Sequence, residues 1–194
     1  MIKCNTFLFF TSSMVEKLKE RHLLFRIRSK KDKTAFGELY DWYVKKIYRF
    51  IYFKVNNREE AEDMTSEVFL KTWNYLIEYK EKEIDSFSGL IYRISRNAVV
   101  DYYRQRAKKM EVQLNDEILI SDERGQMKVE VDYEIEKLLI VIKKLKQDYQ
   151  EVLMFKYVEE LSVSEIAEIL ERSQISVRVT LHRAMKKLKE MIGE

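Results

Sequence analysis

The stretch LSVSEIAEILERSQISVRVTLHRAMKKLKEM, residues 161–191, decides the fold of the C-terminal part of the chain. Ser162 followed by Glu165 has the spacing of a capping box and predicts a helix over residues 163–170. Ser173 follows a short turn and predicts a second helix that runs to about Met191. The buried seam of this second helix is predicted from helical spacing: Val177, Leu181, Ala184 and Leu188. Two helices joined so tightly indicate a helix-turn-helix, whose second helix can enter a major groove.

The charge of the second helix favours DNA as its target. Residues 172–189 contain six basic residues and no acidic one, and backbone phosphates reward such a cluster through counterion release. The first turns of a recognition helix usually read bases, and here they carry Gln174, Ser176 and Arg178. Arginine suits guanine and glutamine suits adenine. The alternative interpretation is an amphipathic helix whose basic face is only solvated.

Working back toward the N-terminus, three further helices are predicted. Apolar residues at helical spacing indicate a first strong helix over residues 34–54. Asn57 opens a second, whose inner face is Ala61, Met64, Val68, Thr72 and Leu76. The third, over residues 86–109, carries six basic residues against one acidic residue, with three interleaved tyrosines.

Between the basic third helix and the C-terminal helices the composition inverts. Residues 111–136 hold nine acidic residues against two basic ones, and hydrophobic periodicity is weak. We interpret residues 108–132 as an acidic flexible linker that spans ~80 Å when fully extended. The chain has no proline and 4 glycines, which argues against sheets with tight turns. The predicted fold is therefore all-α, with two small helical domains joined by this linker.

Several function classes are excluded on composition. No glycine cluster is present to cradle a phosphate, and two histidines without a Glu-x-x-His pair do not suit a metal centre. We therefore expect no enzymatic activity, no catalytic residue, no metal and no cofactor. The single cysteine, Cys4, favours a reducing compartment. The apolar run at residues 7–10 is too short for the core of a signal peptide, and no stretch approaches the ~18 apolar residues of a membrane span. Translation starting at Met14 is an alternative for the first residues.

Two segments carry a resemblance to a known family. EEAEDMTSEVFLKTWNYL (residues 59–76) resembles region 2.2 of the sigma-70 superfamily, and FSGLIYRISRNAVVDYYRQRAKK (residues 87–109) resembles regions 2.3 to 2.4. A two-domain plan without a third domain is similar to the extracytoplasmic-function (ECF) group of RNA polymerase sigma factors. The resemblance implies an N-terminal segment (1–30), sigma region 2 (31–107), the linker (108–132) and sigma region 4 (133–192).

The resemblance also implies partners and residue roles. The chain would bind core RNA polymerase at the β′ clamp helices and the β flap, contact duplex promoter DNA at −35 and the melted strand at −10, and be held inactive by an anti-sigma factor in the cytoplasm. The implied polymerase-binding residues are Asp63, Ser66, Glu67, Leu70 and Asn74. Those implied at the −10 element are Arg93, Arg96, Asn97 and Arg104. Those implied at the −35 element are Gln174, Ser176, Arg178, His182 and Arg183.

The resemblance also implies roles for the loop 82–86 and for the linker between the two domains. The loop 82–86 would hold a base pulled from the stack, a step that costs a few kcal/mol. The reach of the linker exceeds two turns of DNA, so that one chain touches both promoter elements.

The chain departs from the family pattern at two places. Glu171 stands in the helix-turn-helix turn where glycine is frequent, and Leu145-Lys146 stands where Leu-Pro is frequent. Two rival functions remain open at this point. One is a stand-alone helix-turn-helix regulator of duplex DNA, and the other is a carboxylate-metal enzyme that acts on nucleic acid.

Overall fold

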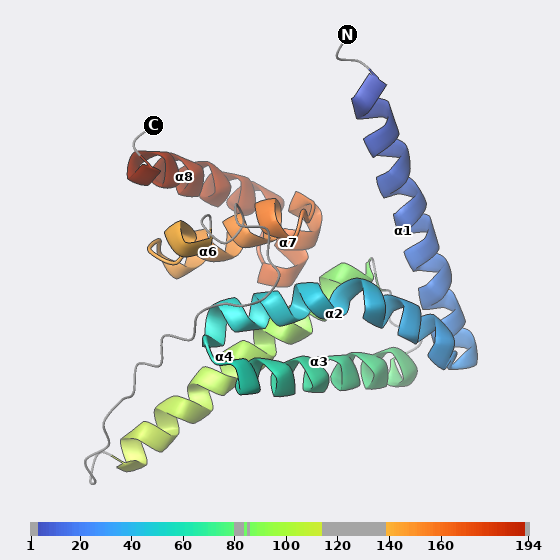
Figure 1. The fold of residues 1–194 in the computed structure, drawn as a ribbon, viewed down its shortest axis with the longest axis horizontal. Helices are drawn as coiled ribbons and strands as arrows, with labels where there is room; N and C mark the ends of the chain where they lie inside the picture. Colours follow the sequence, from blue (N-terminus) through green and yellow to red (C-terminus); the bar gives the residue numbers. More distant parts are fainter. Residues whose placement is uncertain (1–3, 80–83, 85, 114–138, 193–194) are drawn as a thin grey trace.

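The computed structural model describes residues 4–79, 84, 86–113 and 139–192 (Figure 1). Every regular element within these ranges is helical, which confirms the all-α prediction. The predicted linker lies almost wholly outside the described residues. The elements are α1 (Cys4–Lys30), α2 (Lys33–Val55), α3 (Arg58–Glu78), α4 (Phe87–Gln113), α6 (Gln147–Leu153), the π-helical segment η1 (Met154–Val158), α7 (Val163–Leu170) and α8 (Gln174–Ile192).

Helices α2, α3 and α4 pack together, and their starts are set by local side chains. Asp32 accepts a hydrogen bond from the backbone N–H of Ala35 at the start of α2. Asn57 does the same for Glu60 at the start of α3, as its capping position predicts. The predicted inner face of α3 is buried throughout. The local patterns therefore placed these two helices correctly.

Helix α1 is an element that the hydrophobic pattern did not reveal. It packs against α2, and in Figure 1 it runs away from the bundle toward the N-terminus. Its buried side chains are Glu20, Leu23, Leu24 and Ile27, while Leu18 and Phe25 are exposed. Because apolar residues lie on both the buried and the exposed side, the helix shows little periodicity. Glu20 accepts hydrogen bonds from the Tyr43 hydroxyl and from the backbone N–H of Phe87, the first residue of α4.

The C-terminal helices form the predicted helix-turn-helix. Ser162 and Glu165 make both hydrogen bonds of the capping box at the start of α7. The backbone N–H of Ser176 donates to Ser173 Oγ, 3.2 Å away, at the start of α8. Glu171 closes α7 in the left-handed conformation, with φ 53°, at the position where glycine would be unstrained. The four predicted seam residues of α8 are buried.

The two groups of helices contact one another directly. Helix α7 packs on α4, and in Figure 1 the C-terminal helices lie along one side of α2 and α4. The ring of Phe155, in η1, stacks on Phe50 of α2 at 5.2 Å and meets Tyr92 of α4 edge-on at 5.6 Å. All three side chains are fully buried. The two helical domains therefore share an aromatic contact within one core.

Candidate nucleic-acid interface

The recognition helix α8 presents its predicted DNA-binding residues to solvent. Gln174, Ser176, Arg178, His182 and Arg183 are all exposed. They are held in place because the opposite, apolar face of the same helix is buried. The guanidinium of Arg178 donates to Gln174 Oε1 at 3.3 Å, so these two side chains lie together on the first turns. An exposed basic face on a rigid, capped helix can dock in a major groove.

Two apolar residues on α8 belong to this surface and were missed from the sequence. Ile175 is 72% exposed and Val179 is 44% exposed. They stand one helical turn apart, between the exposed polar residues. The sequence could have revealed both residues, since they are apolar and fall outside the predicted buried seam of the helix. Apolar side chains in this position suit the methyl group of thymine.

The predicted −10 residues on α4 are in two different situations. Asn97 and Arg104 are exposed. Arg93 and Arg96 are half-buried, because glutamates of the C-terminal helices face them. Arg93 Nη1 lies 3.8 Å from Glu168 Oε1. Arg96 Nε lies 3.4 Å from Glu151 Oε2. The structure thus leaves only part of this set open to solvent.

The tyrosines of α4 combine packing with exposure. Tyr103 is 48% exposed, and its hydroxyl donates to the carbonyl of Lys54 at 2.6 Å. Its ring meets that of Tyr102 edge-on at 5.3 Å, and Tyr102 is partly buried. The two tryptophans of the chain, Trp42 and Trp73, are partly buried against the hydrophobic core.

The predicted polymerase-binding residues of α3 form an exposed strip. Asp63, Ser66, Glu67, Leu70 and Asn74 are all exposed, and Leu70 is 61% exposed. Carboxylates beside an exposed leucine suit a partner that offers both basic and apolar side chains.

A groove of about 360 Å³ runs beside this strip, between α2 and α3. It is lined in part by the α2 residues Tyr40, Val44 and Tyr48, which are not among the site residues predicted from the sequence.

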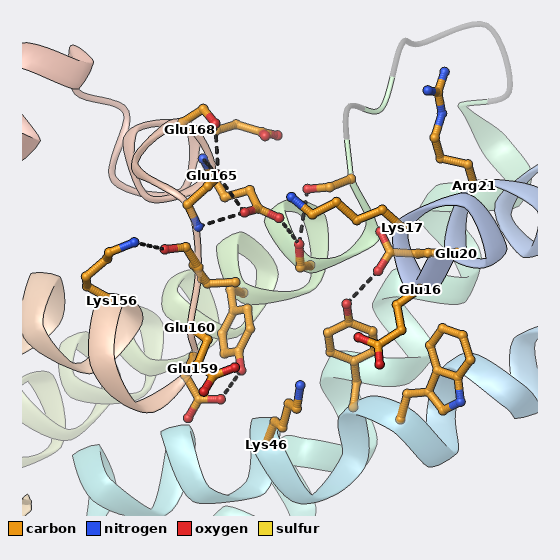
Figure 2. Close-up of a pocket in the computed structure, with 18 of the residues that line it drawn as sticks. Glu16, Lys17, Glu20, Arg21, Lys46, Lys156, Glu159, Glu160, Glu165 and Glu168 are labelled. Atoms are coloured by element: carbon orange, nitrogen blue, oxygen red, sulfur yellow. Dashed lines mark hydrogen bonds between the residues drawn. The ribbon is translucent and has the colours of Figure 1, made fainter. Parts of the chain in front are cut away.

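A larger cleft of about 1420 Å³ separates α1 from α7 (Figure 2). Its lining is rich in glutamates, among them Glu16, Glu20, Glu159 and Glu165, with Lys17 facing them. Within the ranges that the structure describes, no three histidine, cysteine or acidic side chains are grouped as metal ligands.

Glu159, which lines this cleft, is a buried carboxylate with two partners. It accepts hydrogen bonds from Arg49 Nη2 at 2.8 Å and Nε at 3.0 Å, and from the Tyr92 hydroxyl. Burial raises the pKa of Glu159, and the charge of Arg49 works against that rise. Burial also raises the pKa of Tyr92, so that this hydroxyl stays protonated and able to donate.

Comparison with known proteins identifies the family. The family model described as "Sigma-70 region 2" matches residues 39–109, and the one described as "Sigma-70, region 4" matches residues 135–188. Together they cover more than half of the chain. These matches fall on the bundle of α2 to α4 and on the helix-turn-helix. The chain belongs to the sigma-70 family of RNA polymerase sigma factors, and its curated relatives place it in the ECF group.

Two of those relatives illustrate the likeness. The ECF RNA polymerase sigma factor SigW of Bacillus subtilis is 29% identical over 180 residues, covering 85% of this chain and 92% of SigW. The ECF RNA polymerase sigma factor BldN of Streptomyces coelicolor is 27% identical over 162 residues. That match covers 82% of this chain but 61% of BldN.

Solved structures share the fold. CnrH, solved in complex with the cytosolic domain of CnrY, matches with a TM-score of 0.63 at 20% identity, covering 90% of this chain and 97% of CnrH. The sigma factor RpoE of Bartonella quintana, solved with the anti-sigma factor NepR, matches with a TM-score of 0.62 at 16% identity, covering 81% of this chain and 96% of RpoE. Among the described helices of the present chain, none is long and apolar enough to cross a membrane.

Proposed function

We propose that this sigma factor binds core RNA polymerase through the exposed strip of α3, reads a −35 element with α8 and engages a melted −10 element with α4. The observation that carries the proposal is the pairing of two unlike exposed surfaces in one chain. The strip on α3 is acidic and apolar, whereas the face of α8 is basic. A protein that only bound duplex DNA would need the second surface and not the first.

The −35 assignment rests on the chemistry of the first turns of α8. Arg178 and Gln174 offer donors to guanine and adenine edges, and Ile175 and Val179 offer methyl contacts to thymine. Ser176 lies between them on the same turns, whereas His182 and Arg183 lie further along the exposed face, where Arg183 would hold a phosphate. This arrangement favours base reading at the N-terminal end and backbone contact beyond it.

We assign the proposed contacts to the two regions of the chain that match the family models. Region 2 is assigned to residues 31–107 and region 4 to residues 133–192, with the acidic linker 108–132 allowing separate promoter elements to be reached. The loop 82–86 remains assigned to the flipped base, although most of it lies outside the described residues.

The chain acts by binding, and the chemistry of RNA synthesis belongs to the polymerase. We therefore assign it no enzymatic activity of its own and place it in the cytoplasm, where the polymerase is. We also assign it an anti-sigma factor as a partner. The support for that partner is a shared fold with RpoE, which was solved with NepR.

Reconstituted transcription tests the proposal. Core polymerase, this chain and a genomic promoter library are mixed, and the start sites of the transcripts are mapped. We expect transcripts with defined starts that depend on the chain, and their loss in Arg178→Ala with Gln174→Ala. The matched control is Lys30→Met, on an exposed position of α1 away from all proposed surfaces. A library that yields no start-site-specific transcripts overturns the proposal.

Binding to core polymerase distinguishes a sigma factor from a stand-alone regulator of duplex DNA. Such a protein binds duplex DNA but neither retains core polymerase on an affinity column nor stimulates transcription from defined starts.

A further inference from the structure

Helix α1 carries an apolar strip on the side that faces away from the bundle. Val15, Leu18 and Phe25 are large apolar side chains, yet they are 62%, 57% and 67% exposed. Because an α-helix turns by ~100° per residue, these three positions and His22 fall on one side of α1, opposite the buried Ile27. In Figure 1 the helix runs away from the bundle, and no other described element covers this side. Val15, Leu18, His22 and Phe25 are called the outer strip of α1 below.

The charges of α1 are sorted around the outer strip. Residues 15–28 contain five basic and two acidic residues. Both acidic ones lie on the bundle side, where Glu16 lines the cleft and Glu20 is buried. Among the basic ones, Lys17 is turned into the cleft (Figure 2). The other four border the strip, with Arg21 and Arg28 along one edge and Lys19 and Arg26 along the other. Within residues 15–28, the outer side of α1 is therefore apolar along its centre and cationic along both edges.

Two of the bordering cations can reach an anion outside the chain. Arg21 is exposed and makes no ion pair with another described residue. Lys19 Nζ lies 3.5 Å from Glu38 Oε2, but the lysine side chain is 54% exposed, so this pair is weak and the ammonium group can turn outward. Arg26 is held more firmly, because its Nε and Nη2 donate to Asp32 Oδ2 at 2.9 and 2.7 Å.

An anionic phospholipid surface fits both parts of this pattern. Apolar side chains such as Leu18 and Phe25 can enter the boundary between headgroups and acyl chains, while the lysine and arginine side chains beside them contact phosphates. Nucleic acid would satisfy the cations but would leave the apolar centre of the strip without a matching surface. A second copy of the chain would cover the apolar centre but would bring the cationic edges together. Since none of the described helices can cross a membrane, the contact would lie at the membrane surface.

We propose that the outer strip of α1 is a docking surface for an anionic phospholipid bilayer. The helix lies along the bilayer, with Leu18 and Phe25 inserted at the level of the headgroups and with Arg21 and Lys19 beside phosphates. From Val15 to Phe25 the strip extends over ~15 Å of the helix. It shares no residue with the surfaces proposed for polymerase and DNA on α3, α4 and α8, so the inference goes beyond the proposed function and does not depend on it.

The first measurement is the sedimentation of the full chain with vesicles. Vesicles of phosphatidylcholine and phosphatidylglycerol in equal parts are compared with vesicles of phosphatidylcholine alone. We expect the chain to bind the anionic vesicles, and Leu18→Gln with Phe25→Gln to weaken this binding at least about tenfold, because two inserted apolar side chains are lost. The matched control, Ile140→Gln with Tyr157→Gln, removes two exposed apolar side chains from the C-terminal half and leaves vesicle binding unchanged.

A second pair of variants tests the cationic edges. Lys19→Gln with Arg21→Gln is expected to weaken binding to the anionic vesicles by about fivefold, since a basic side chain near an anionic surface contributes to binding. The matched control is Lys144→Gln with Lys146→Gln, which removes two positive charges from exposed positions of the C-terminal half. It is expected to retain the vesicle binding of the parent chain. Equal losses in the two pairs would mean that net charge alone attracts the chain to the vesicles, and would overturn the proposal.

A third measurement reports which side of α1 meets the lipid. An environment-sensitive dye is attached to His22→Cys, in a chain whose native cysteine is replaced by Cys4→Ser. We expect its emission to shift to shorter wavelength when anionic vesicles are added. The same dye at Glu16→Cys, on the bundle side of the same helix, is the matched control and should show no shift. This measurement leaves Leu18 and Phe25 in place, so it tests the proposal even if the glutamine pair disturbs α1.

The remaining outcomes overturn the proposal and indicate another occupant. Vesicle binding that survives Leu18→Gln with Phe25→Gln would come from another part of the chain. A shift of the His22→Cys dye with random-sequence duplex DNA, and none with vesicles, would assign the outer strip to nucleic acid. A dimer that forms without lipid and is lost in Leu18→Gln with Phe25→Gln would assign the strip to a second copy. None of these measurements contains polymerase, so a failure of start-site-specific transcription bears on the proposed function alone.

Discussion

The rings of Phe50 and Phe155 stack 5.2 Å apart with 21° between their planes, although 105 positions separate them in the chain. Both are fully buried, one in α2 and the other in η1. We expect Phe50→Leu and Phe155→Leu to show a coupling energy of ~1 kcal/mol in a double-mutant cycle. Urea unfolding of the four proteins measures it. Additive effects would mean that the rings do not meet in solution.

Replacement of Glu171 by glycine should stabilise the chain. Glu171 holds φ at 53°, a conformation that is strained for residues with a side chain. We expect Glu171→Gly to raise the unfolding free energy by about 1 kcal/mol, as the net of relieved strain and lost backbone entropy. Thermal unfolding reports the change. Glu190→Gly, inside α8, is the control and should lower the melting temperature.

Charge reversal on α3 should weaken polymerase binding selectively. Asp63→Lys with Glu67→Lys changes two exposed carboxylates of the strip, so we expect at least a tenfold loss in affinity for core polymerase, corresponding to ~1.4 kcal/mol. Binding of the −35 duplex should be unaffected. Asp41→Lys, an exposed position on α2, is the matched control. Equal losses in polymerase and duplex binding would disprove the assignment of this strip.

Ile175 should report on thymine methyl groups in the −35 element. We expect Ile175→Ala to weaken duplex binding by about fivefold, roughly the value of one buried apolar contact. Replacing thymine by uracil in the duplex should weaken duplex binding by the parent chain by a similar factor. The same replacement should leave duplex binding by Ile175→Ala unchanged. Met191→Ala, an exposed apolar residue near the end of α8, should respond to uracil as the parent does. If uracil weakens duplex binding by Ile175→Ala as much as by the parent chain, Ile175 does not contact a thymine methyl group.

The cap of α2 should make stability depend on acid pH. The backbone N–H of Ala35 and the side chain of Arg26 lower the pKa of Asp32 below its usual 3.8. Because the folded pKa is the lower one, this stabilisation is present above pH 3.8 and is lost as the pH falls through the folded pKa. We expect Asp32→Asn, which keeps the capping oxygen but loses the charge, to melt lower at neutral pH. The difference in melting temperature between the parent and Asp32→Asn should shrink toward zero in acid. A difference that persists at acid pH would contradict a stabilising role for the Asp32 charge.

Sequence patterns were sufficient where structure is decided locally. The boxes and caps at Ser162, Ser173 and Asn57 act over three residues, so each predicted a helix start that the structure confirms. Glu171 was marked as a departure, and its left-handed backbone shows why glycine would fit there.

Other features depend on partners far along the chain and leave no local signature. Arg93 and Arg96 could be selected as DNA-binding candidates, but the sequence does not say that Glu168 and Glu151 face them. The π-helical turn at η1, which brings Phe155 and Glu159 to the contact, has no pattern of its own. Helix α1 was missed because its burial is shared between Glu20 and a few apolar residues.

The position of Glu20 fixes an order of events during synthesis. Its carboxylate, near the N-terminus, completes its hydrogen bonds only with Tyr43 and with the first N–H of α4 at Phe87. A chain made from its N-terminus onward must therefore wait, with the inner side of α1 uncovered, until residue 87 has left the ribosome.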